Sequence, residues 1–315
     1  MRKKKINFSS KRKRNNLNVK RCALIAIAAV LVIVVGFKGV NATTAFIEEK
    51  RQERIEMQKK AEAERLEEER KRKEEEEAKK KMIGVKHGAE SYSYSAEKVA
   101  EKLKSGDYSN NGEKIVFLTF DDGTSTTVTP EILKTLKDEG VKATFFVTGS
   151  NIERGGKKAE DLLKQEFEEG HAIANHSYSH DYGILYPNRT LDLEAFKGDF
   201  KKTDDILKRV LGPYFSTEVI RCPGGHMSWK GMEPLDEYMA ANSMAAIDWN
   251  ALSGDAEGKK KSPEELYNYA VKTSEGKEMV VILMHDTYGK ENTAKALPQL
   301  IKYYKDNGYQ FKVLV

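Results

Sequence analysis

The sequence predicts an α/β domain with a parallel sheet, open or closed into a barrel, that follows a membrane-spanning segment and a charged helix. Three observations predict this organisation. Strand-like and helix-like stretches alternate from Lys114 to the last residue, in units of about 30 residues. An uncharged apolar run occupies residues 22–37. Residues 46–82 consist almost entirely of good helix formers, with no Pro.

The order of elements within residues 113–315 follows from apolar patterning. Short apolar runs rich in β-branched and aromatic residues predict strands, and amphipathic runs predict helices. The expected strands are 115–120, 142–148, 171–175, 219–221, 244–249, 279–284 and 311–315. The expected helices are 130–139, 157–169, 191–211, 263–273 and 292–307. In parallel α/β barrels the chemistry collects at the carboxyl ends of the strands, so the site is expected there.

Charge is distributed unevenly along the chain. The net charge is +5, but residues 1–21 alone contain ten Lys or Arg and no acid. Without these ten residues and Lys38, the remainder carries −6. The bulk of the chain is therefore mildly acidic, which argues against nucleic acid as a partner.

Residues 22–40 predict a transmembrane signal anchor, with residues 1–21 as its basic cytoplasmic tail. The alternative is a signal peptide cleaved after Val40-Asn41-Ala42. In both cases the domain that follows leaves the cytoplasm. The anchor predicts a single-pass protein of the cell membrane, with its large domain extracellular and facing the cell wall.

Residues 46–82 predict a charged helical stalk, and residues 83–112 predict a linker and domain entry. Pairs such as Glu67–Lys71 and Glu69–Lys73 are four residues apart with the acid first, which stabilises a helix. Apolar residues are too irregular for a sustained heptad seam, so a solvated single helix is favoured. The alternative is a weak coiled coil through which the stalk self-associates.

The 115–120 strand ends in two adjacent carboxylates, Asp121 and Asp122. Acids at the end of a buried strand cost free energy unless a cation, a proton or a catalytic role compensates. Neighbouring strand residues point to opposite faces, so the two acids are expected to have different roles, although the turn after them could let both reach one site. A simple Asp-Asp-Gly turn is the alternative.

Further polar groups follow other predicted strands. His176 and His180 are four residues apart, which suits a pair of metal ligands, although two surface histidines are the alternative. Arg221 precedes Gly224 and Gly225, so an arginine able to pair with a carboxylate lies beside backbone that a ligand can approach. An ordinary turn is the alternative there. The sequence leaves His285 and the loop residue Asp255 open between catalytic and structural roles.

Five segments together resemble the polysaccharide deacetylases, the NodB-homology domain of carbohydrate esterase family 4. They are T-F-D-D-G, H-S-Y-S-H, R-C-P-G-G, the stretch from Trp249 to Asp255, and L-M-H, and they cover about residues 113–315. The resemblance implies a distorted (β/α) barrel. It also implies an enzyme that removes acetyl groups from N-acetylated sugars with one divalent metal ion, usually Zn²⁺, with Co²⁺, Mn²⁺ or Ni²⁺ as alternatives.

The resemblance also implies a role for each matching residue. Asp122, His176 and His180 would be the metal ligands. Asp121 would be the catalytic base, oriented by Arg221, and His285 the general acid, tuned by Asp255. The backbone N–H of Gly224 would face the oxyanion, and Trp249 lines the acetyl pocket or belongs to the core. Ala256 departs from the family pattern, because many members have a second Trp there.

The expected location suggests the substrate. An outward-facing deacetylase on a membrane-anchored stalk is expected to act on N-acetylglucosamine residues of peptidoglycan in the cell wall. Chitin oligomers and acetylated xylan are alternative glycans. A non-catalytic glycan-binding scaffold of the envelope is an alternative from another class. The acids and histidines argue against it, because binding alone does not require Asp121 or His285.

Overall fold

A computed structural model describes the backbone of residues 9–80 and 82–315. Before residue 82 it describes the side chains of residues 21, 24–35, 43–44 and 46–73. The chain forms two compact units, Met1–Glu77 and Ala78–Val315. Each unit is described by itself below.

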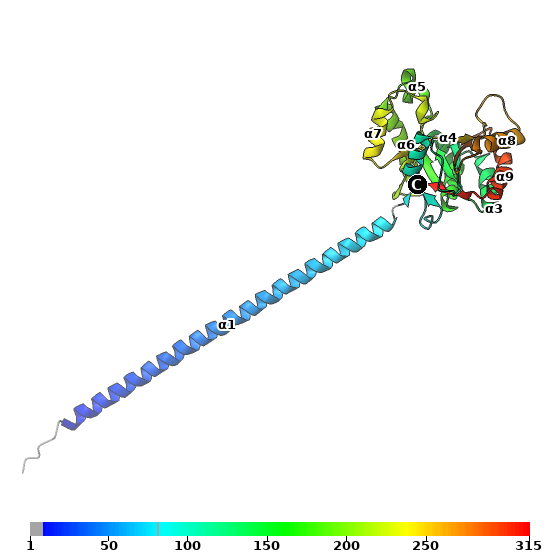
Figure 1. Cartoon of the computed structure of the whole chain (residues 1–315). Helices are drawn as coiled ribbons and strands as arrows, with labels where there is room; N and C mark the ends of the chain where they lie inside the picture. Colours follow the sequence, from blue (N-terminus) through cyan, green and yellow to red (C-terminus); the bar gives the residue numbers. More distant parts are fainter. Residues whose placement is uncertain (1–8, 81) are drawn as a thin grey trace, which may run out of the picture. The chain divides into compact units, whose positions relative to one another are not determined.

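The N-terminal unit is occupied by α1 (Ser9–Lys80), one continuous helix (Figure 1). Good helix formers without Gly or Pro explain the stretch from 43 to 80. Two of the predicted pairs form, Glu67–Lys71 at 3.8 Å and Glu69–Lys73 at 3.0 Å, and both are exposed and add little stability. Residues 46–80 of the helix predicted at 46–82 thus lie within a longer one. Lys81 lies outside the described residues, and Met82 belongs to a short strand rather than to the helix. Its role as a stalk and its self-association stay predictions.

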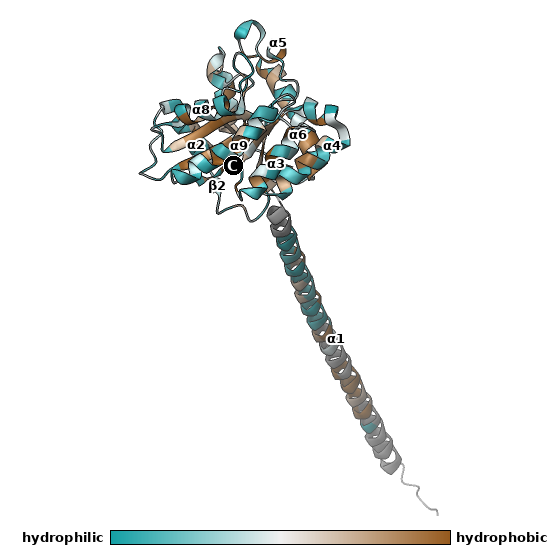
Figure 2. Cartoon of the chain, turned by 90° about the vertical axis from the view of Figure 1, so that its right-hand side faces the viewer, coloured by the Kyte–Doolittle hydropathy of each residue, from teal (hydrophilic) through white to brown (hydrophobic). Residues whose placement is uncertain are grey.

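The hydropathy of α1 changes along its length, from apolar at residues 24–35 to polar further on (Figure 2). Among the residues that the structure describes, no helix is sufficiently long and apolar to cross a bilayer. The predicted anchor at 22–40 falls only partly on described side chains, since those of 22, 23 and 36–40 lie outside them. Of the basic tail at 1–21, only the Arg21 side chain is described. The anchor and the tail therefore stay predictions.

The second unit is built on an eight-stranded parallel sheet with the order β8-β7-β5-β4-β3-β10-β9, and β11 pairs with β3 as well. Its strands are β3 (Ile115–Gly123), β4 (Thr144–Val147), β5 (Ala172–Asn175), β7 (Val219–Ile220), β8 (Ala245–Ala246), β9 (Ala251–Leu252), β10 (Met279–His285) and β11 (Gln310–Phe311). Two short parallel pairs lie outside it: β1 (Met82–Ile83) with β6 (Phe215–Ser216), and β2 (Ser93–Tyr94) with β12 (Val313–Leu314).

Helices connect and cover the strands. They are α2 (Ala96–Ser105), α3 (Thr129–Asp138), α4 (Gly149–Glu168), α5 (Tyr182–Leu185), α6 (Leu193–Leu211), α7 (Glu233–Ala241), α8 (Pro263–Ser274) and α9 (Glu291–Asp306), with short 3₁₀ turns η1 (Pro187–Arg189) and η2 (His226–Ser228). Figure 1 shows α3, α8 and α9 grouped together and α4 beside α6. Local signals explain individual starts: α8 begins at a capping box formed by Ser262 and Glu265.

The two faces of the central strand β3 pack into different clusters. Val116, Leu118 and Phe120 belong to the larger cluster beneath the outer helices. Ile115 and Phe117 belong to a second cluster, together with residues of neighbouring strands and of α2. Burying one apolar side chain of this kind stabilises the fold by about 1.5–3 kcal/mol relative to leaving it exposed. Because alternate residues of a strand share one face, Thr119 and Asp121 lie on the same face as Ile115 and Phe117, that of the second cluster.

The sheet is more open than the distorted barrel that the resemblance implied. The edge strands β8 and β9 do not pair with each other in the described part of the chain, so the sheet is a curled half-barrel. The helix α2, which contacts β8, adds Ala96 and Val99 to the cluster. Because α2 already covers these apolar side chains, the curl does not need further strands to bury its interior.

The predicted strands and helices of this unit all overlap observed elements of the same type, which confirms the α/β class. Two differences concern boundaries. The strand expected at 244–249 is only Ala245–Ala246. The helix expected at 157–169 begins already at Gly149, across a non-helical residue at Gly156. The strand β9 and the helices α2, α5 and α7 were not predicted.

Candidate active site

The two adjacent carboxylates reach one site because the strand is irregular where they occur. The register of β3 against β4 shifts between Asp121 and Gly123. Asp122 itself has a φ of 65°, in the left-handed region that non-glycine residues rarely adopt. The alternation of a regular strand is thereby broken, and Asp121 Oδ2 and Asp122 Oδ1 both lie 3.6 Å from His176 Nε2. The opposite faces of a regular strand therefore do not apply at these two residues, and both acids reach one site, as the turn after them allows.

Asp122, His176 and His180 form a cluster whose ligand atoms all lie within 4.8 Å of one another. We call these three residues the metal trio. Asp122 Oδ1 is 3.6 Å from His176 Nε2 and 3.4 Å from His180 Nε2. Ligand atoms at 2.0–2.2 Å from a tetrahedral ion lie about 3.3–3.6 Å apart, so these separations fit one ion.

Hydrogen bonding also fits a cation at the trio. Asp122 Oδ1 is buried and is without a hydrogen-bond partner among the described residues. His176 Nδ1 lies 2.8 Å from the carbonyl oxygen of Arg221, which only accepts, so Nδ1 carries the proton and Nε2 keeps its lone pair. Burial lowers the pKa of His176 to about 3 and keeps the ring neutral. The residues present therefore suit a divalent metal ion.

A buried carboxylate holds the loop between the two histidines. Asp199 of α6 accepts hydrogen bonds through Oδ2 from the backbone N–H groups of Tyr178 and Ser179, both at 2.9 Å. The side chain of Asn175 accepts from Ser177 N at 2.9 Å. Sequence reasoning missed both residues, since a single acid in an amphipathic helix carries no signal of such a contact.

Arg221 and Asp121 form a buried ion pair. Arg221 is 0% exposed and donates from Nη1 to Asp121 Oδ1 at 2.6 Å and to Thr119 Oγ1 at 2.9 Å. Its Nε donates to the carbonyl oxygen of Ile247 at 2.8 Å, so the guanidinium is well satisfied. Burial raises the pKa of Asp121 above its ordinary value, although Arg221 opposes the shift. The pair fixes Oδ1 and leaves Oδ2 toward the metal trio.

His285 lies directly opposite Asp121, because β10 pairs with β3 in this register. Its Nδ1 is 2.8 Å from Asp255 Oδ1, and its backbone N–H donates to Asp255 Oδ2 at 2.9 Å. Thr293 Oγ1 also donates to Asp255 Oδ2, at 2.8 Å. Burial alone would lower the pKa of His285, but the hydrogen bond and charge of Asp255 outweigh it and raise the pKa to about 9. Asp255 thus keeps the imidazole of His285 protonated. It contacts Nδ1 and leaves Nε2 available to another group.

The glycine turn after Arg221 exposes backbone beside these groups. Gly224 and Gly225 both have positive φ, 78° and 86°. No hydrogen bond to the N–H of Gly224 occurs within the described residues, whereas the N–H of Gly225 donates to Cys222 O at 2.8 Å. Trp249 is partly buried, packing against the second core cluster with its ring beside Gly225. Trp249 therefore has the core contacts of one alternative, and its place in an acetyl pocket stays a prediction.

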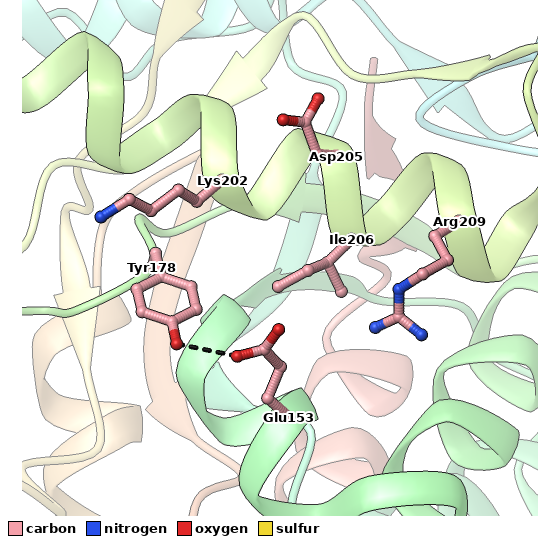
Figure 3. A pocket seen from close by; sticks show the side chains of 6 residues that line it. All are labelled: Glu153, Tyr178, Lys202, Asp205, Ile206 and Arg209. Carbon is pink, nitrogen blue, oxygen red and sulfur yellow. Dashed lines mark hydrogen bonds between the residues drawn. The ribbon is translucent and has the colours of Figure 1, made fainter.

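Two other features lie outside the site. His171 is fully buried and accepts a hydrogen bond from Ala143 N at 3.1 Å, which gives it a structural role. A surface pocket of about 360 Å³ lies between α4 and α6 (Figure 3). Tyr178 lines it and donates to Glu153 at 2.8 Å, and none of the metal trio is among its lining residues.

Fold and site together define the class: the metal trio, the Asp121–Arg221 pair and the His285–Asp255 pair meet at the carboxyl edge of a curled parallel sheet. The family model described as polysaccharide deacetylase matches residues 108–233. A peptidoglycan-N-acetylglucosamine deacetylase of Bacillus cereus is 31% identical over 208 residues, which covers 65% of this chain and 71% of that protein. The chain belongs to the polysaccharide deacetylase family and is a hydrolase.

Solved structures agree. A carbohydrate esterase family 4 (CE4) esterase of Streptococcus mutans matches with a TM-score of 0.68 and 39% identity, over 75% of this chain and 99% of that one. The catalytic domain of a peptidoglycan N-acetylglucosamine deacetylase from Eubacterium rectale matches with a TM-score of 0.57 and 32% identity. This match covers 66% of the present chain and 92% of that one. These likenesses concern the whole domain, and the role of each site residue stays a prediction.

Proposed function

We propose that this protein hydrolyses the N-acetyl group of N-acetylglucosamine residues in a cell-wall polysaccharide, peptidoglycan in particular. The observation that carries the proposal is the convergence of the metal trio with two charge-paired residues, Asp121 and His285, at one edge of the sheet. Amide hydrolysis needs an activated nucleophile, a stabilised oxyanion and a proton for the leaving amine. The site contains a candidate for each.

Asp122, His176 and His180 would hold one divalent ion, with Zn²⁺ favoured by the two imidazoles and one carboxylate. The same donors accept Co²⁺, Mn²⁺ or Ni²⁺. Such an ion, when bound, polarises the acetyl carbonyl and activates water. The carbonyl oxygen of Arg221 fixes the His176 ring so that Nε2 faces Asp122.

Asp121 is assigned the role of general base. Arg221 occupies its Oδ1 at 2.6 Å, which leaves Oδ2, directed at the trio, to accept the proton of the attacking water. Arg221 also fixes the orientation of this carboxylate, because its guanidinium is itself held by Thr119 and Ile247.

His285 is assigned the role of general acid. With its Nδ1 bonded to Asp255, it donates the Nε2 proton to the sugar amine as the amide bond breaks. The raised pKa of about 9 keeps this proton available at neutral pH. The N–H of Gly224 is assigned to the oxyanion, and Trp249 to the wall of the acetyl site.

Two named relatives support peptidoglycan as the substrate, since the matching proteins of B. cereus and E. rectale are both peptidoglycan N-acetylglucosamine deacetylases. We further propose that residues 22–40 anchor the chain in the cell membrane, with the hydrolase domain on the wall side. The ten basic residues within 1–21 support this orientation. Recovery of the full-length chain from the membrane fraction, with its domain cleaved by external protease, is the expected result. A mature N-terminus at Thr43 would contradict the anchor.

The test of function is acetate release by the full chain from purified peptidoglycan and from chitin oligomers and acetylated xylan. We expect the fastest release from peptidoglycan, its loss on chelation, and its return on adding Zn²⁺. Faster release from another glycan would reassign the substrate. Glycan binding without any acetate release would instead support the non-catalytic scaffold.

A further inference from the structure

The backbone at Gly224 and Gly225 is bare and lies between aromatic rings. A Cβ added to Gly224 would lie 3.0 Å from the Trp229 ring and 3.3 Å from Tyr182 Oη. A Cβ added to Gly225 would lie 3.0 Å from the Trp249 ring. Any larger residue at either position would displace these rings. The two glycines therefore form a strip of backbone without side chains of its own, partly exposed at Gly224 and buried at Gly225, with Tyr182 and Trp229 on one side and Trp249 on the other.

Tyr182 lies next to the metal trio, in sequence and in space. It begins α5 only two residues after His180, and its ring centroid is 5.4 Å from that of His180. The N-cap Asp181 accepts from Gly183 N at 2.7 Å and fixes the start of α5. Despite these contacts Tyr182 remains 44% exposed, so part of its ring faces solvent beside the site.

Trp229 supports Tyr182 from behind. The two ring centroids are 5.0 Å apart. Trp229 in turn stacks on buried Tyr186 at 4.2 Å and donates from its indole N–H to Pro223 O at 2.9 Å. The indole is thus held in place, and Tyr182 rests against a rigid wall.

We propose that Tyr182, supported by Trp229, stacks on the pyranose ring whose acetyl group lies at the metal trio. A pyranose presents an apolar C–H face that matches an exposed aromatic ring, and hydroxyls that match the phenol oxygen. Tyr182 Oη lies beside Gly224, where the acetyl carbonyl is expected, so ring and acetyl group can be bound together. The ligand class is an N-acetylated hexosamine glycan. This inference rests on the proposed function and adds the residue that selects a sugar over other acetyl compounds.

Binding can be measured without turnover. The chain contains two tryptophans, and both, Trp229 and Trp249, flank this strip, so tryptophan fluorescence reports from the proposed subsite. The full chain, treated with chelator to prevent hydrolysis, would be titrated with tetra-N-acetylchitotetraose. We expect Tyr182→Ala to weaken Kd about tenfold, which corresponds to about 1.4 kcal/mol. Tyr182→Phe should weaken it by less than about threefold, because the ring is retained.

Tyr214→Ala is the matched control, since Tyr214 is also 44% exposed but precedes β6, outside the site. It should bind the tetrasaccharide as the unsubstituted chain does. Zn²⁺ affinity of Tyr182→Ala, measured separately, should stay within about twofold and show that the trio is intact. Unchanged tetrasaccharide binding by Tyr182→Ala, or an equal loss in Tyr182→Phe, would overturn the proposal. Absence of acetate release would refute the proposed function instead, whatever the binding result.

Discussion

The metal trio and the two proton-transfer residues lie at the same edge of the sheet but differ in how the protein compensates their charge. Asp121 Oδ1 forms an ion pair with Arg221 Nη1 at 2.6 Å, and His285 Nδ1 pairs with Asp255 Oδ1 at 2.8 Å. Asp122 has neither a Lys nor an Arg among its described ion pairs, only the two imidazoles at 3.4 and 3.6 Å. Its Oδ1 is a buried acceptor without a hydrogen-bond donor in the described structure.

The difference shows that the Asp121–Arg221 and His285–Asp255 pairs are complete without a ligand, whereas the metal trio is not. A buried carboxylate oxygen without a partner is costly, so we expect a cation from solution to stabilise the trio. The proton-transfer residues are already held by permanent partners and do not depend on that cation for their geometry. Removing the metal should therefore leave the Asp121–Arg221 and His285–Asp255 pairs in place, and removing either pair should leave the metal bound.

The largest effect is expected from breaking the trio. His180→Ala should lose bound metal and lower kcat/KM by at least about 10³-fold, because the ion supplies several kcal/mol of transition-state stabilisation. Metal content measured together with circular dichroism checks that the fold remains. The exposed His87 is the matched control, and His87→Ala should keep both metal and activity. Stoichiometric metal in His180→Ala would remove His180 from the ligand set.

Asp121→Asn tests the other half of the comparison. It keeps the shape of the side chain but removes the base, so kcat should fall by about 10²–10³-fold, within the range of general-base catalysis. Metal affinity should change little, since Asp122 and the histidines remain. Turnover and metal content are measured on the same preparation. Loss of metal in step with activity would show that Asp121 is a ligand and that the two halves are not separate.

His285→Ala should lower kcat/KM at neutral pH by about 10²-fold and change its pH dependence. In the unsubstituted protein, activity should fall as pH rises and His285 loses its proton, at or below the pKa of about 9, because a bound cation opposes protonation. The variant should lack this alkaline limb. His226→Ala is the control, since His226 also pairs with an acid at 2.8 Å and should keep the limb. A limb unchanged in His285→Ala would make His285 structural.

Asp255→Asn should give the smallest effect, about tenfold in kcat/KM at pH 7. The amide can still accept a hydrogen bond from His285 but no longer carries the charge that raises its pKa. The alkaline limb should therefore move down to about pH 6.5 or below, the ordinary range for histidine. Full pH profiles of both proteins measure the shift. A profile that does not move would exclude Asp255 as the group that tunes His285.

The sequence by itself determined the main elements and the set of site residues. Periodicity predicted the strands β3, β5, β7 and β10, since parallel strands leave recognisable apolar runs. Residue chemistry then singled out the acids, histidines and arginine at those ends. Spacing along the chain cannot place one strand beside another, so the pairing of Arg221 with Asp121 rested on resemblance alone. The two-residue strand β9 and the four-residue helix α5 were not predicted, because so few residues show no period, and the longer helices α2 and α7 were not predicted either.

Only the tertiary structure decided how these residues meet. The register shift at Asp122 turned two adjacent carboxylates toward one site, against the alternation expected from a strand. Sheet order placed His285 opposite Asp121, although more than half of the second unit separates them in sequence. The open curl was decided by α2, which fills the interior with Ala96 and Val99. The physical reason is common to all three: sequence patterns report which face of a local segment is buried, whereas register, sheet order and closure depend on packing between distant segments.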